Sequence, residues 1–377
     1  MLYLDNAATA PVRREVLEAM TPYLTRAFGN PSSHHTVGEA AARALDDARA
    51  RVARVLGMRA GDIVFTSGGT EADNLAVKGI AIAAQLNHGA RHVVTLPVEH
   101  EAVLQSVEYL QRVHGFDATL VPVDETGRVD PAEVAAALRD DTALVSIGYA
   151  NNEVGTVQDV AALAEVCRAR GIPVHLDAVQ AAGWLPLAGT GADALSIAGH
   201  KIGAPKGTGA LAVRGRVPLE PLVHGGGQER GRRSGTENVA GAVALAVALE
   251  LAEAEREEDA AAVAALRDAF IARVLSAVPQ ARVTGDPVHR LPCTASFTFA
   301  GTSGEAVLLE LERRGIVSSS GSACAAGADE PSHVLTAMGI DRETAQTSVR
   351  FTLPHGWRQS LHPVADAVAA SVAAVIG

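Results

Sequence analysis

The chain has 377 residues, of which 48% are hydrophobic, and its formal net charge is -11 at pH 7. Because this length is long for a single hydrophobic core, we expect two domains. The negative charge argues against a nucleic acid or an anionic membrane as partner, since binding to phosphate groups requires clustered positive charge.

The N-terminal residues turn polar within a few positions, which is not typical of a signal peptide. No apolar stretch reaches the roughly 20 residues that a membrane-spanning helix requires. The 3 cysteines occupy unrelated positions and give no disulfide framework, as in proteins of a reducing compartment. We therefore expect a cytoplasmic protein without a membrane partner, and we predict no metal site.

Short β-branched runs alternate with alanine-rich helical segments through the first two thirds of the chain. The runs predict strands at 63–66, 92–95, 118–121, 143–147, 174–177 and 194–197. Helices are predicted between most of them, at 71–86, 101–114, 131–139 and 160–170. This alternation indicates an α/β fold with a mostly parallel sheet and helices on both faces.

The pattern changes in the last third. A long helix from 243 to about 256 precedes a helix at 260–278, a strand at 295–299, a helix at 305–314 and a final helix after 363. These elements predict a smaller α+β unit, and we place the domain boundary near 250–260, where a helix crosses it.

In parallel sheets, ligands bind beyond the C-terminal strand ends. Lys201 lies shortly after the predicted strand 194–197, and it is one of only three lysines among 32 basic residues. A lysine amine condenses with carbonyl groups, which a guanidinium does not do. Lys201 is therefore predicted to be a Schiff-base lysine, although a genome that favours arginine would also leave few lysines.

Asp177 ends the predicted strand 174–177. A carboxylate at a buried strand end is costly unless it meets a cation or several hydrogen-bond donors. A pyridinium nitrogen about 4 Å away would attract it by ~4 kcal/mol at an effective dielectric constant near 20, and the ring would stay protonated. The alternative is that Asp177 caps the next helix.

Gly69 and Thr70 lie in a small-residue turn that leads from strand 63–66 into a helix. Such a turn lets backbone N–H groups approach a phosphate at a helix N-terminus, although taken alone the pattern favours a plain turn with Thr70 as N-cap, because such turns are common. Ring charge, covalent attachment and phosphate binding are the three needs of pyridoxal phosphate. Asp177, Lys201 and Thr70 together predict this cofactor.

Three further residues are candidates: His100 and Asn152 follow predicted strands, and Arg350 lies in the second domain. His100 begins a helix, where the helix dipole favours a neutral ring that could stack or exchange a proton. Asn152 lies in a turn after strand 143–147, and Arg350 could bind a substrate carboxylate through two hydrogen bonds. The alternatives are an exposed helix start, an ordinary turn and a surface arginine.

Cys324 lies among small polar residues in the segment 317–327, which predicts a mobile loop rather than a packed thiol. We expect a nucleophile that needs a nearby base, because a thiol with a pKa of ~8.5 is largely protonated at pH 7. Cys167 and Cys293 are expected to be packing residues.

These motifs resemble, in chain order, those of the cysteine desulfurases of the NifS/IscS type. The resemblance covers nearly the whole chain, from Tyr3 to about Phe351. It rests on Ser67-Gly68-Gly69-Thr70-Glu71, Glu99-His100, Asn151-Asn152-Glu153-Val154-Gly155, Asp177-Ala178-Val179-Gln180, Gly199-His200-Lys201, His224-Gly225-Gly226-Gly227-Gln228-Glu229-Arg230, Arg233-Ser234-Gly235-Thr236 and Ser319-Ser320-Gly321-Ser322-Ala323-Cys324.

The resemblance implies a homodimer with the aspartate-aminotransferase fold, which is fold type I of the pyridoxal-phosphate-dependent transferases. The large cofactor-binding domain would span 14–255, and 1–13 with 256–377 would form the small domain that carries the Cys324 loop. The implied reaction converts L-cysteine to L-alanine and leaves the sulfur on Cys324 as a persulfide. An acceptor protein would then use that sulfur for iron–sulfur clusters or other sulfur-containing products.

The resemblance also implies a role for each site residue. Lys201 would carry the cofactor, Asp177 would pair with the ring nitrogen, and His100 would stack on the ring and move protons. The other implied contacts are Gln180 with the ring hydroxyl, Asn152 with cofactor or substrate, Arg350 with the substrate carboxylate, and Gly69, Thr70, His200 and the partner subunit's Thr236 around the phosphate.

The chain departs from the family pattern at two places. Ala198 replaces a usual serine and removes one phosphate hydroxyl, and the chain ends at Gly377 without the extension by which relatives dock an iron–sulfur scaffold. Two other functions stay open at this stage: a selenocysteine lyase or sulfinate-acting relative, and a non-catalytic cofactor-binding or sulfur-carrier scaffold.

Overall fold

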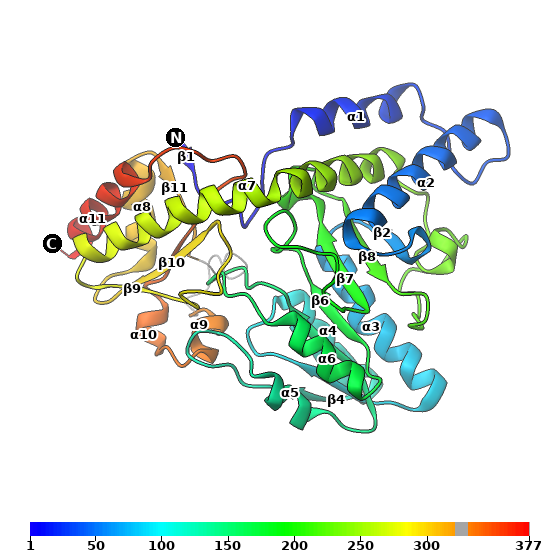
Figure 1. The fold of residues 1–377 in the computed structure, drawn as a ribbon, viewed down its shortest axis with the longest axis horizontal. Helices are drawn as coiled ribbons and strands as arrows, with labels where there is room; N and C mark the ends of the chain where they lie inside the picture. Colours follow the sequence, from blue (N-terminus) through cyan, green and yellow to red (C-terminus); the bar gives the residue numbers. More distant parts are fainter. Residues whose placement is uncertain (321–330, 377) are drawn as a thin grey trace.

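The computed structural model describes residues 1–320 and 331–376. Its centre is a seven-stranded sheet with the order β2-β8-β7-β6-β5-β3-β4 (Figure 1). Five neighbouring strands run parallel, and β8 is antiparallel to both of its neighbours. The strands are β2 (Ile63–Thr66), β3 (His92–Thr95), β4 (Asp117–Leu120), β5 (Thr142–Gly148), β6 (Val174–Asp177), β7 (Ala194–Ala198) and β8 (Gly209–Val213).

Helices cover both faces of this sheet, because alternate strand residues are apolar on each side. Val93 packs into a core cluster with α3 (Gly69–His88) and α4 (Glu101–His114), whereas its neighbour Val94 packs into the cluster on the other face. The helices that contribute to that other cluster are α1 (Arg14–Thr25), α2 (Thr36–Leu56), α5 (Pro131–Ala137), α6 (Val160–Ala169), the first half of α7 (Val239–Ala277), and the short helices α9 (His333–Ala337) and α10 (Arg342–Ala345) of the last third of the chain.

A smaller unit is built from the last third of the chain and the first few residues. In it, β10 (Thr294–Phe299) lies between β9 (Ala281–Val283) and β12 (Val349–Thr352) in an antiparallel sheet, while β1 (Leu2–Tyr3) pairs with β11 (Ile316–Val317). Its own core cluster centres on phenylalanines from α7, β10 and β12. The remaining helices are α8 (Gly304–Arg313) and α11 (His362–Ile376).

The structure corrects two predictions about these elements. The helices predicted at 243–256 and 260–278 form one continuous helix of 39 residues, since no proline or glycine interrupts it after Gly241. The sequence prediction also lacked β8, which follows Lys201 and closes the sheet between β7 and β2. A helix does cross the predicted boundary near 250–260, and the division into 14–255 and the remainder stays a prediction.

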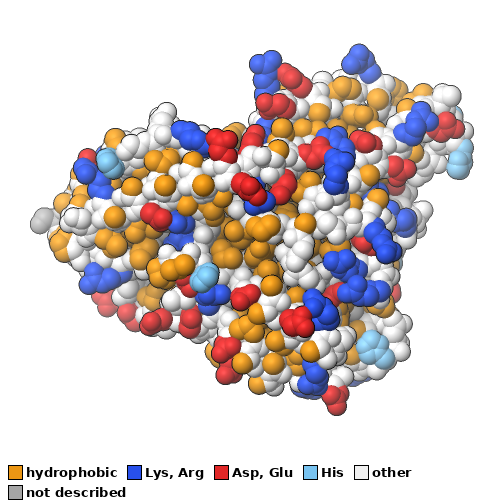
Figure 2. Space-filling view, viewed as in Figure 1, with side chains coloured by type: hydrophobic (Ala, Val, Ile, Leu, Met, Phe, Trp, Pro, Cys, Tyr) orange, Lys and Arg blue, Asp and Glu red, His pale blue; other side chains and the backbone are white. Residues whose placement is uncertain are grey.

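The face of the molecule seen in Figure 2 carries no cluster of side chains that all have the same charge. Basic and acidic side chains are interspersed there over all the elements in view. Among the helices that the structure describes, none is both long enough and apolar enough to cross a bilayer.

Candidate functional site

A cavity of about 560 Å³ lies where several parallel strands of the large sheet end. Its volume is within the range of small-molecule sites. Nearly all residues that the sequence singled out line it: Gly69, Thr70, His100, Asn152, Asp177, Gln180, His200, Lys201 and Arg350. Residues far apart in the chain therefore meet at one place, as the parallel topology predicts.

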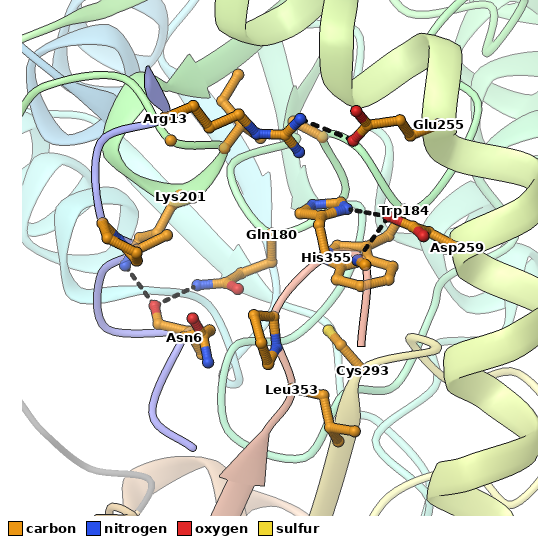
Figure 3. A pocket seen from close by; sticks show the side chains of 18 of the residues that line it. Asn6, Arg13, Gln180, Trp184, Lys201, Glu255, Asp259, Cys293, Leu353 and His355 are labelled. Carbon is orange, nitrogen blue, oxygen red and sulfur yellow. Dashed lines mark hydrogen bonds and ion pairs between the residues drawn. The ribbon is translucent and has the colours of Figure 1, made fainter. Parts of the chain in front are cut away.

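Lys201 ends a short 3-10 helix (Gly199–Lys201) that follows β7. Its half-buried Nζ donates to the carbonyl oxygens of Ala7 and Ala8, the latter at 2.8 Å (Figure 3). Gln180 Nε2 donates to the same Ala7 oxygen at 3.1 Å. The N-terminal segment is thus held in the cavity wall by the two side chains expected to contact a cofactor.

Asp177 is the last residue of β6. Burial raises the pKa of its carboxyl group, whereas the Val179 N–H, which donates to Oδ1 at 2.9 Å, lowers that pKa. The charges of His100 and Lys201 lower it further. The carboxylate therefore lies close to two basic groups in the wall of the cavity.

The first turn of α3 forms another wall. Gly68, not Thr70, precedes the helix, so the alternative that Thr70 is the N-cap is wrong. A Cβ atom on Gly69 would lie only 2.7 Å from Val179 Cγ2, so only glycine allows this helix start to approach the strand end so closely. The N–H groups of a first helical turn have no partner within the helix and can bind an anion.

Two histidines face the cavity. His100 caps α4, and its Nδ1 accepts a hydrogen bond from the Ala102 N–H at 3.0 Å, so that nitrogen carries no proton. His200 Nδ1 lies 3.2 Å from Thr9 Oγ1. Burial, with the nearby Lys201 and Lys206, lowers the pKa of His200 to about 4. At neutral pH His200 is therefore a neutral hydrogen-bonding group.

Arg350 reaches the cavity from β12 of the smaller unit, with its side chain almost fully buried. Nη2 forms an ion pair with Asp5 Oδ1 at 2.7 Å, and Nη1 donates to the Asn152 carbonyl oxygen at 2.7 Å. The alternative of a surface arginine is wrong. Asn151, by contrast, forms the predicted turn, because its Oδ1 accepts from the N–H groups of Glu153 and Val154.

One predicted residue does not line this cavity, and another lies outside the part of the chain that the structure describes. Thr236 lines a separate cavity of about 230 Å³ beside Ser67 and Thr208, so it does not meet Lys201 within one subunit. Cys324 lies outside the described residues. Cys167 and Cys293 are buried, as expected, and burial raises the pKa of their thiols to about 12 and about 11.

The sequence interpretation missed two buried acids at the cavity. Burial raises the pKa of Glu99 to about 8, and it raises that of Asp73 well above its ordinary range, with a further contribution from the charge of Asp177. Asp73 is 2% exposed, and its Oδ1 has no hydrogen-bond partner within the described residues. Both lie beside recognised motifs, but only the tertiary structure reveals that they are buried.

A hydrogen-bonded chain lies next to Asp73. His175 is fully buried between Ser146 and Ser196, and each of its ring nitrogens is 2.9 Å from a serine oxygen. Its Nε2 is 3.7 Å from Asp73 Oδ1. Burial lowers the pKa of His175 to about 3, so this ring is neutral and does not compensate the carboxyl charges.

The cavity residues fit pyridoxal phosphate on geometric grounds. An amine, a carboxylate and a glycine-initiated helix start line one cavity, and each matches a different part of that molecule. The close approach that Gly69 permits and the unpartnered buried oxygen of Asp73 are features that a plain structural turn does not need.

The comparisons with known proteins define the class. The family model for aminotransferase class-V matches residues 2–365, and the chain belongs to this family. It is 44% identical over 354 residues to the cysteine desulfurase IscS of Dictyoglomus turgidum, covering 93% of this chain and 89% of the relative.

Solved structures agree with this assignment. A NifS-like protein superposes with a TM-score of 0.88 at 36% identity, covering 98% of both chains. A structure described as SspA in complex with cysteine superposes with a TM-score of 0.82 at 35% identity, covering 94% of this chain and 99% of that one. The fold is therefore the fold type I expected from the sequence.

Proposed function

We propose that this protein is a cysteine desulfurase, which takes sulfur from L-cysteine and leaves L-alanine. The observation that carries the proposal is the shared cavity of Lys201, Asp177 and His100. A relative at 44% identity bears the name cysteine desulfurase, and a similar structure is described as a complex with cysteine.

Pyridoxal phosphate is the proposed cofactor. Lys201 would hold its aldehyde, Asp177 its ring nitrogen, Gln180 its ring hydroxyl, and Gly69, Thr70 and His200 its phosphate. When bound, this cofactor supplies an electron sink for bonds at the substrate's α-carbon. Asp177 serves that chemistry because its negative charge favours a protonated ring nitrogen.

His100 and Lys201 are the proposed proton carriers. The Nδ1 of His100 is engaged by the Ala102 N–H, which leaves Nε2 as the nitrogen that can exchange a proton. The Lys201 amine can accept a proton once it is released from the Ala7 and Ala8 carbonyl oxygens. Asn152 would position the substrate or the cofactor, and Arg350 would bind the substrate carboxylate through its guanidinium group.

Cys324 is the proposed sulfur acceptor. Its thiolate attacks the sulfur of the substrate, so that an S–S bond forms while the carbon–sulfur bond breaks. The electron pair of the broken bond stays with carbon, which takes up a proton and becomes the methyl group of alanine. Cysteine and the Cys324 thiol thereby give alanine and a Cys324 persulfide, with no further oxidant or reductant.

We also propose a homodimer in the cytoplasm that delivers the persulfide sulfur to an acceptor protein, such as an iron–sulfur scaffold. Thr236 supports the dimer proposal, because it lies in a different cavity from Lys201 within one subunit. The partner subunit's Thr236 would complete the phosphate site.

The test is to mix the purified protein with L-cysteine and to quantify alanine together with protein-bound persulfide. We expect equal amounts of both in a single turnover. Cys324→Ala should keep the absorbance of the bound cofactor and lose sulfur transfer. A Cys324→Ala variant as active as the wild type would remove the role assigned to this thiol, and the absence of alanine would remove the proposed function.

A further inference from the structure

A second cavity, of about 490 Å³, adjoins the active-site cavity (Figure 3). It is almost as large and also falls within the range of small-molecule sites, roughly 300–1,000 Å³. The two cavities share a wall made of Ala7, Val179, Gln180 and Lys201. The proposed reaction gives no role to this second space.

Most of the surface that lines the second cavity is apolar. Trp184, which follows β6 of the large sheet, stacks on His355, which follows β12. Their ring centroids are 3.9 Å apart and their planes are inclined by 11°. Other apolar lining residues are Pro11, Ile202, Leu353 and Pro354. The walls therefore come from both units of the fold, and they suit an apolar or aromatic body.

At the rim of this cavity, the basic side chains are already paired with carboxylates. Arg13 is paired with Glu255 at 2.7 Å, and Arg358 is shared between Asp259 at 2.8 Å and Glu258 at 3.1 Å. Asp259 also lies 3.5 Å from His355 Nδ1. These contacts leave both rim arginines engaged by carboxylates.

One buried acceptor at this cavity stays without a partner, because Asn6 Oδ1 accepts no hydrogen bond within the described residues. Glu15, which is exposed, adds a further carboxylate to the lining. A ligand that brings a positive charge and an N–H donor would complement this surplus of acceptors.

We propose that this cavity is a second binding site for a small molecule with an apolar or aromatic body and a protonated amine. Because Ala7, Val179, Gln180 and Lys201 line both cavities, a ligand in the second cavity contacts residues that also form the wall of the active site. Its occupancy is therefore coupled to turnover.

The experiment uses the fluorescence of Trp184. The chain has two tryptophans, and Trp357→Phe leaves Trp184 alone. The cofactor-loaded Trp357→Phe protein is titrated with N,N-dimethyl-2-phenylethylamine, whose tertiary nitrogen cannot condense with an aldehyde. Matched probes are 2-phenylethanol, which is neutral, and phenylacetate, which is an anion. We expect a saturable emission change with the amine, at least tenfold tighter than with phenylacetate.

Three variants locate the binding. Pro354→Phe, which adds bulk at the cavity, should abolish the emission change, whereas His333→Ala, which alters only the active-site cavity, should leave it within about twofold. Glu15→Gln combined with Glu258→Gln should remove the preference for the amine, and both positions are exposed, so folding is not at risk.

The desulfurase rate should change with a midpoint equal to that of the emission change. Absence of saturation, equal affinity for amine and phenylacetate, or binding that survives Pro354→Phe would each overturn the proposed site. A rate that is unaffected at saturation would overturn the coupling. The emission titration requires no turnover, so its outcome is independent of the proposed desulfurase activity.

Discussion

Arg49 and Glu229 form a bidentate ion pair, with N–O distances of 2.6 and 2.8 Å, inside the protein. Their side chains are only 6% and 2% exposed. Arg49 also donates to the Ile63 carbonyl oxygen and lies over the ring of Phe65. The pair thus joins α2 and β2 to the segment 224–236, which carries Thr236.

The backbone at Glu229 explains why this pair matters for that segment. Glu229 and Arg230 have φ angles of 50° and 59°, which is a left-handed backbone conformation that residues other than glycine rarely adopt. Such a conformation persists only where surrounding contacts enforce it. The Arg49 contact is one of those contacts.

We predict that Arg49→Met lowers the free energy of unfolding by about 3–5 kcal/mol, because it leaves the Glu229 carboxylate buried without its cation. Urea unfolding measures the change. Arg14→Met is the control, since Arg14 and its partner Glu18 are largely exposed and should contribute less than about 1 kcal/mol. Adding Glu229→Gln to Arg49→Met should recover part of the loss; equal stability of Arg49→Met and Arg14→Met would contradict the argument.

Lys201→Ala should remove covalent cofactor attachment and lower the desulfurase rate by more than about a thousandfold, because no other amine can replace its two proposed roles. Borohydride treatment followed by mass spectrometry detects the attachment. Lys206→Ala is the matched control, because Lys206 lies only five residues after Lys201 and its side chain is exposed. A Lys201→Ala protein that still gives a borohydride-stable adduct at the active site would refute the assignment.

The sequence predicted several strands well because a run of β-branched residues is a local signal. The strand runs at 63–66, 92–95 and 174–177 agree with the structure residue for residue. The strand Gly209–Val213 was missed, since its sequence, Gly-Ala-Leu-Ala-Val, has only one β-branched residue and is short. Hydrogen bonding to β7 and β2 stabilises this strand, although its own composition does not favour one.

The site features that the sequence could not predict depend on contacts between distant segments. The ion pair of Arg350 with Asp5 joins residues 345 positions apart, so no local pattern indicates it. Glu99 stands in the predicted motif next to His100, but its burial follows from how β3 and β5 pack. A Cβ atom on Gly148 of β5 would lie only 2.9 Å from Glu99 Oε2.

The raised pKa of Glu99 predicts a pH dependence of stability. The folded value is about 8 and the ordinary value is 4.5, so between these pH values the folded protein keeps a proton that the unfolded chain releases. The free energy of unfolding therefore falls as pH rises through this window, by up to about 1.4 kcal/mol per pH unit from this group. Below pH 4.5 its contribution is complete, and above pH 8 it is lost.

Glu99→Gln should remove this dependence, because glutamine does not titrate. In urea unfolding of the cofactor-free protein from pH 5 to 9, the variant should gain stability relative to the wild type as pH rises and reach a plateau above about pH 8. Glu125→Gln, at an exposed position, should follow the wild type throughout. A constant difference between Glu99→Gln and the wild type across this range would show that Glu99 is ionised in the folded protein.

Arg350→Lys tests the proposed carboxylate site. A lysine has no planar set of donors, so it cannot keep the contacts to Asp5 and to the Asn152 carbonyl oxygen while it also binds a substrate carboxylate. We expect KM for L-cysteine to rise by about 10- to 100-fold, which corresponds to about 1.4–2.7 kcal/mol, with the cofactor absorbance unchanged. Arg282→Lys, at an exposed position of β9, should leave KM within about twofold. If Arg350→Lys instead lowers kcat alone and leaves KM as in the wild type, the guanidinium acts through Asp5 and the N-terminal segment rather than on the substrate.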